Sequence, residues 1–204
     1  MNTEAGVDPG QPGTPAALTQ AIHERIATLA GDYLKLAAQQ TGTLPHTDFD
    51  PDWPSPCMAG EPVDGRCQWQ PVAMAPVPDF GRLEEALEVT VHPAVRAAFT
   101  THWSAGLPLL YNENAFELLQ LWSEQDFDNL LGNFIGHALE KKRVRQSLTL
   151  FFALVDDEQL LTIDNDTGVV LLETLGKPAP EEISASLPDF LLDCSAYFPS
   201  HPTS

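Results

Sequence analysis

The first strong pattern along the chain is a run of apolar residues at mostly helical spacing within residues 18–40. It predicts a long amphipathic helix with one buried face. Thr14 or Thr19 can cap the start of this helix, and Gly42 lies just beyond its end. The apolar positions are Ile22, Ile26, Leu29, Leu34 and Leu36.

A second helical pattern follows Ser123, a favourable N-cap residue with Asp126 three positions later and Glu124 in the first turn. This helix is expected to end in the basic run 141–143, because cations at a helix C-terminus complement its dipole. The residues expected to face the core are Phe127, Leu130, Leu131, Phe134, Ile135 and Leu139.

Short apolar runs separated by turn residues predict strands joined as hairpins. Further helices are expected over residues 93–102 and 180–194. This order predicts an α+β fold, a single domain in which helices pack on one side of an antiparallel or mixed sheet. The predicted strands cover residues 107–111, 115–122, 148–155, 159–164 and 169–174.

The distribution of prolines and glycines indicates where the folded domain begins and where it contains a long loop. The first sixteen residues hold three prolines and three glycines with little apolar content, which is typical of a disordered arm. Many prolines in residues 44–80 predict a long loop, and Trp53 and Trp69 indicate that this loop packs on the domain. The predicted organisation is an arm at 1–16, a domain at 17–194 and a flexible tail at 195–204.

Charge narrows the range of partners. Among 204 residues, 29 are acidic and 10 are Lys or Arg, so the net charge is −19. This charge repels nucleic acid and anionic lipid, and it attracts a cationic partner. Residues 151–204 alone contain ten acidic residues and one basic residue, Lys177. These carboxylates either converge at the rim of a sheet or serve as polar turns and a source of solubility, and the sequence leaves both readings open.

Three cysteines form no disulfide framework, which favours a reducing compartment. The N-terminus has no basic start followed by an apolar segment, and the apolar runs are too short to cross a bilayer, so we expect neither export nor a membrane span.

The sequence contains no recognisable motif of a catalytic, metal-binding or phosphate-binding site. The six histidines lack the spacing of a zinc site, and the glycines form no phosphate-binding loop. No Gly-x-Ser-x-Gly nucleophile motif occurs, and Cys57 has no local signature of a catalytic thiol. We therefore expect a protein that is not an enzyme and that holds no cofactor or metal.

Several motifs together resemble one known family. The block LLQLWSEQDFDNLLGNFIGH at 118–137 resembles the central motif of the Syd family of SecY-interacting proteins. The pieces WPSPC at 53–57, CQWQPV at 67–72 and LEEALEVTVHPAV at 83–95 are similar to earlier family segments in the same order. The segments LFFAL at 150–154, LETLG at 172–176 and ISASLPDFL at 183–191 match its latter half, so the resemblance covers about residues 18–193.

The resemblance implies a SUKH-like fold and a peripheral protein on the cytoplasmic side of the inner membrane. Such a protein would bind the basic cytoplasmic loops of SecY through an acidic groove, as a regulator or quality-control factor of the translocase. It would contact the membrane only through SecY and would bind no nucleic acid. A SUKH-type immunity protein that neutralises a toxin is the alternative. The acidic positions within the matched motifs, and hence the expected groove residues, are Glu84, Glu88, Glu124, Asp126 and Glu173.

Overall fold

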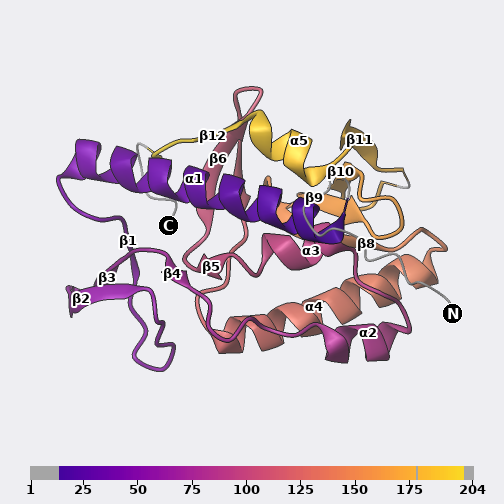
Figure 1. Ribbon diagram of the computed structural model, residues 1–204, viewed down its shortest axis with the longest axis horizontal. Coiled ribbons are helices and arrows are strands. Elements are labelled where there is room, and N and C mark those ends of the chain that lie inside the picture. Colours follow the sequence, from indigo (N-terminus) through magenta and orange to yellow (C-terminus); the bar gives the residue numbers. More distant parts are fainter. Residues whose placement is uncertain (1–13, 178, 200–204) are drawn as a thin grey trace, which may run out of the picture.

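Helix α1, Pro15–Thr41, runs along a large part of the length of the computed structural model, which describes residues 14–177 and 179–199 (Figure 1). The Thr14 hydroxyl accepts a hydrogen bond from the Ala17 N–H at 3.2 Å and thereby caps the helix. Gly42 ends it in a left-handed conformation, with φ of 74°, which costs glycine little because it has no Cβ atom. The predicted helix and both of its caps are confirmed.

A seven-stranded antiparallel sheet forms the centre of the fold, in the order β11-β10-β9-β8-β7-β6-β12. Short hairpins join most of its neighbouring strands, as the alternation of apolar runs and turn residues predicts. The α+β class, the single domain and the antiparallel sheet are thus confirmed. The strands are β6 Leu107–Tyr111, β7 Asn114–Leu118, β8 Thr149–Leu154, β9 Gln159–Asp164, β10 Val170–Thr174, β11 Glu181–Ser184 and β12 Cys194–Ala196.

The helices cover both faces of this sheet rather than the one side that we expected. Phe190 of α5, Leu187–Leu192, packs against Phe116 of β7. Phe134 of α4, Glu124–Arg143, packs against Phe151 of β8. The cross-strand pairing places Phe116 and Phe151 on opposite faces. The remaining helices are the short α2, Gly81–Leu87, and α3, Pro93–Ala98.

Helix α4 begins with a complete capping box, because Ser123 and Asp126 each accept the other's backbone N–H. Most of its expected core residues are buried, but Leu139 is 58% exposed, so that prediction was wrong at one position. Lys141 is buried, and it therefore does more than complement the helix dipole.

The proline-rich segment forms strands where we expected a loop. Strands β1 His46–Asp48, β2 Met58–Val63 and β3 Arg66–Trp69 make a small antiparallel sheet, and β4 Val72–Ala73 pairs with β5 His102–Trp103. Asp64 and Gly65 turn β2 into β3 with positive φ, as in a tight hairpin. Proline is tolerated because Pro62 lies on the edge strand β2. Trp69 is buried, which confirms that this segment packs on the domain.

The two ends of the chain also differ from the expected boundaries. Pro15 and Ala16 belong to α1, while residues 1–13 of the expected arm lie outside the described residues. The expected helix over 180–194 is split, because β11 pairs with β10 and α5 starts only after its N-cap Ser186. Within the expected tail, β12 pairs with β6, and Phe198 stacks on Tyr33 of α1. Residues 200–204 lie outside the described residues.

His102 on β5 predicts how stability will depend on pH. The side chain is 6% exposed, and its Nε2 atom is the buried side-chain nitrogen that lacks a hydrogen-bond partner within residues 14–177 and 179–199. Burial, followed by the charge of the nearby His23, lowers the pKa of His102 from 6.5 to about 4. As the pH falls, His102 is therefore protonated in the unfolded chain before it is protonated in the folded chain. The free energy of unfolding decreases by about 3 kcal/mol as the pH drops from 6.5 towards 4.

Urea unfolding at pH 7 and pH 5 checks this expectation. His102→Gln should reduce the pH dependence, and part of it should remain because burial also lowers the pKa values of His23, His92 and His137. The same change at the exposed His46 should leave the dependence as in the wild type. If the free energy of unfolding of His102→Gln changes between pH 7 and pH 5 as much as that of the wild type, another group causes the pH dependence.

Candidate acidic groove

Two adjoining hollows lie between the small sheet and the β6–β7 part of the large sheet, with volumes of about 460 and 360 Å³. Thr47, Asp48, Ala105 and Gly106 line both hollows, so the two form one continuous depression, which we call the acidic groove. No helix in the described part of the chain is long and apolar enough to cross a membrane. In the same residues, no group of three or more His, Cys, Asp or Glu side chains is placed to hold a metal ion.

Carboxylates dominate the charged lining of the groove. Asp48, Asp50, Glu117 and Asp126 line it, and among its described lining residues Arg66 is the only arginine or lysine. Arg66 Nε lies 3.9 Å from an oxygen of Asp48, whose side chain is fully exposed, so this weak pair leaves most of the negative charge unbalanced.

One end of the groove is held by indole hydrogen bonds. Trp53 donates from Nε1 to Asp126 Oδ1 at 3.0 Å, and Trp122 donates from Nε1 to the Trp53 carbonyl at 3.1 Å. The second oxygen of Asp126 accepts the Ser123 N–H at 3.0 Å. These bonds tie the loop before β2 to the start of α4, so Asp126 has both a capping role and a place in the groove.

Glu117 lies at the other end, in the middle of β7. Its neighbours Phe116 and Leu118 point into the core, so the alternation of a strand directs Glu117 to the groove side. The side chain is exposed, but the protein around it displaces part of the water from the carboxyl group and raises its pKa. Among the described residues, no hydrogen bond or ion pair engages this carboxylate.

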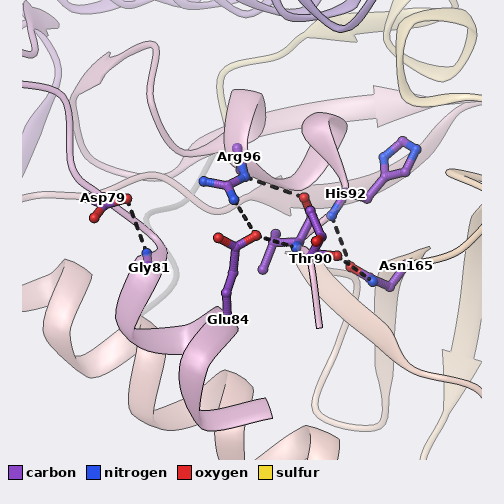
Figure 2. A network of polar contacts seen from close by, with 8 residues as sticks. Asp79, Gly81, Glu84, Thr90, His92, Arg96 and Asn165 are labelled. Carbon is purple, nitrogen blue, oxygen red and sulfur yellow. Dashed lines mark hydrogen bonds and ion pairs between the residues drawn. The ribbon is translucent and has the colours of Figure 1, made fainter. Parts of the chain in front are cut away.

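Glu84 is half-buried, and its carboxylate is engaged within the fold rather than in the groove. It forms an ion pair with Arg96 of α3 and accepts the Val91 N–H at 2.7 Å, which lowers its pKa mainly through the bond to Arg96. Figure 2 shows Glu84 on α2 pointing towards Arg96, beside the contact of the His92 N–H with Asn165 Oδ1 at 3.0 Å. This network fixes α2 and α3 to the loop between β9 and β10.

Glu173 is also engaged within the fold. Its Oε2 atom lies 2.6 Å from Lys141 Nζ, and its Oε1 atom accepts hydrogen bonds from Thr149 and Thr162. Lys141 and Asp126 are fifteen residues apart on α4, so Glu173 lies about 20 Å from the Asp126 end of the groove. The structure therefore does not bring the five predicted carboxylates together in one hollow.

Of the five predicted residues, Asp126 lines the groove and Glu124 is exposed beside it in the first turn of α4. Glu88 is exposed at the end of α2, in a left-handed conformation with φ of 55°. Sequence reasoning missed Asp48, Asp50 and Glu117. Two of these lie in the segment that we took for a loop, and Glu117 had a local signal as the single acid between two buried positions of an apolar strand.

Comparison with known proteins agrees with the motifs. The profile of the family described as Syd protein (SUKH-2) matches residues 23–195. A Protein Syd from Pseudoalteromonas atlantica is 41% identical over 180 residues, which cover 85% of this chain and 95% of that relative. A Protein Syd from Psychromonas ingrahamii is 38% identical over 153 residues, which cover 74% of this chain and 83% of that relative. A third, from Colwellia psychrerythraea, is 34% identical over 188 residues, or 87% and 92% of the two chains. The chain therefore belongs to the Syd family.

Proposed function

We propose that this protein binds the basic cytoplasmic loops of SecY through the acidic groove, without catalysing a reaction. It would act as a regulator or quality-control factor of the translocase. The observation that carries the proposal is the gathering of Asp48, Asp50, Glu117 and Asp126 in one depression, where the described lining residues include one arginine and no lysine. The protein would be peripheral on the cytoplasmic side of the inner membrane and would reach it through SecY.

Charge complementarity supports this partner. Cytoplasmic loops of membrane proteins are enriched in Lys and Arg, and the groove presents the opposite charge. One exposed carboxylate contact contributes only about 0–1 kcal/mol, but several act together on the rate and orientation of encounter. The net charge of −19 extends the attraction beyond the groove at low ionic strength.

The residues predicted from sequence divide into two groups under this proposal. Asp126 acts in the groove, and the exposed Glu124 and Glu88 add attraction at a distance. Glu84 and Glu173 act through the fold, because their carboxylates are engaged by Arg96 and Lys141. Charge reversal at these last two positions would disturb folding and is therefore unsuited to mapping the binding surface.

The test is association with SecY reconstituted in nanodiscs, measured by biolayer interferometry between about 50 and 300 mM salt, a range over which screening of exposed charges strengthens. The variant Asp48→Asn with Asp50→Asn should slow association about threefold to tenfold at low salt, since charges at an interface govern the association rate. The control Glu181→Gln with Glu182→Gln removes the same charge from the exposed strand β11 and should change the rate far less.

Equal slowing by both pairs would mean that net charge alone drives binding and that the groove has no special part. Wild-type protein that fails to associate with SecY at low salt would overturn the proposed partner and would direct attention to a toxin-neutralising role.

A further inference from the structure

Glu117 has an exposed side chain in the groove, and no counterion lies beside it among the described residues. Its cross-strand neighbours are Pro108 on β6 and Leu154 on β8, and neither can neutralise it. Arg66, the one arginine of the groove lining, lies beside Asp48 instead. An unpaired carboxylate is stabilised when a cation with hydrogen-bond donors binds to it, because charge-assisted hydrogen bonds are stronger than neutral ones.

Gly106 leaves room for this carboxylate. A Cβ atom added to Gly106 would lie 2.6 Å from Glu117 Cδ and closer still to Oε1, a separation that packed atoms do not adopt. The Glu117 side chain thus lies directly over the Gly106 backbone, where any side chain at position 106 would displace it.

Three aromatic side chains line the same hollow. Tyr33 stacks between Trp69, with ring centroids 5.9 Å apart at 21°, and Phe198, at 5.8 Å and 26°. All three rings line the 460 Å³ hollow together with Glu117. The negative charge of Glu117 also contributes, after burial, to the raised pKa of Tyr33, which agrees with the closeness of the two side chains.

We propose that Glu117, Gly106 and the aromatic stack form a socket for one arginine side chain of the partner segment. The proposal rests on the function proposed above and adds a specificity-determining residue to it. An arginine fits better than a lysine because its planar guanidinium can pair with a carboxylate through two hydrogen bonds and lie on an aromatic ring. The ring available for this contact is the partly exposed Phe198, since Trp69 is buried and Tyr33 is covered on both faces. Its aliphatic stem would cover the apolar wall. The volume lies within the range of about 300–1,000 Å³ that is usual for ligand pockets, so a side chain and its flanking backbone have space.

Titration with capped arginine, N-acetyl-arginine methylamide, tests the socket independently of SecY. Two-dimensional NMR of the full chain should show saturable shifts of the Gly106 amide and the Trp69 indole, and the neutral isostere capped citrulline should produce none. Glu117→Gln, which keeps the shape and removes the charge, should abolish the shifts. Glu181→Gln, on the far strand β11, should retain them. Absence of a saturable shift in the wild type, or its persistence in Glu117→Gln, would overturn the socket.

Binding to SecY in nanodiscs then separates the two proposals. Glu117→Gln should weaken affinity about tenfold, mainly through faster dissociation, whereas Asp50→Asn should mainly slow association. Replacing a loop arginine of SecY with lysine should weaken binding of the wild type but not of Glu117→Gln if that arginine occupies the socket. If the wild type binds SecY and Glu117→Gln loses no more affinity than Asp50→Asn does, the socket is refuted, but binding through the acidic groove is not.

Discussion

Replacing Glu173 with alanine is expected to lower the free energy of unfolding by about 3–5 kcal/mol, the typical cost of breaking a buried ion pair. The side chains of Lys141 and Glu173 are 9% and 13% exposed, and their charged atoms lie 2.6 Å apart. Burial opposes ionisation of Glu173, but the bonds from Lys141 and Thr149 outweigh it, so its pKa is lowered. The variant would leave the ammonium group of Lys141 buried without its counterion.

Two further variants separate the effect of the unpaired charge of Lys141 from the effect of lost packing. The double variant Lys141→Met with Glu173→Leu removes both charges and should recover most of the lost stability, since apolar residues of similar size often replace buried pairs well. Glu181→Ala, at an exposed position of the neighbouring strand, should change stability by less than about 0.5 kcal/mol. Chemical denaturation at pH 7 measures all three variants. A loss below about 1 kcal/mol in Glu173→Ala would show that water reaches Lys141 in the folded state.

The Lys141–Glu173 pair illustrates what a sequence does not reveal. Lys141 belongs to a basic run at a helix end, for which the helix dipole gives a sufficient reason, and Glu173 belongs to an acidic stretch. Neither pattern indicates that the two side chains meet in the interior. The pairing depends on α4 crossing the β8–β10 face of the sheet, and long-range placement of this kind is not encoded in local spacing.

Local signals, in contrast, predicted most of the large elements. The caps at Thr14, Gly42 and Ser123 fixed the ends of two helices, because each satisfies backbone groups that a helix leaves unpaired. The turn at Asn112 and Glu113 joins β6 to β7 with positive φ at both residues, as the hairpin pattern requires.

The small sheet was missed for a physical reason. Prolines weaken the local preference for strands, so the segment 44–80 resembles a loop until the edge position of Pro62 is known. Asp64-Gly65 was the available signal, since this dipeptide favours the tight turn between β2 and β3. Asp48 and Asp50 were missed with this sheet, although the family motifs pointed to an acidic surface.

Phe190→Ala is the second change expected to have a large effect, with a loss of about 3–5 kcal/mol in the free energy of unfolding, as is typical for a buried aromatic residue. Phe190 is fully buried, and its ring lies 4.7 Å from Tyr111, 5.6 Å from Phe116 and 5.8 Å from Phe152 between centroids. Its helix, α5, leads directly into β12, so the cavity would weaken the attachment of the last described strand to β6.

The matched control is Leu192→Ala in the same helix, because Leu192 is 66% exposed and should change stability by less than about 0.5 kcal/mol. Urea unfolding followed by tryptophan fluorescence measures both variants. Hydrogen exchange should show lost protection in β12 of Phe190→Ala, because this edge strand depends on α5 for its position. Equal stability of the two variants would mean that α5 contributes little to the core. Lost stability with β12 still protected would mean that β6 holds the last strand without help from the helix.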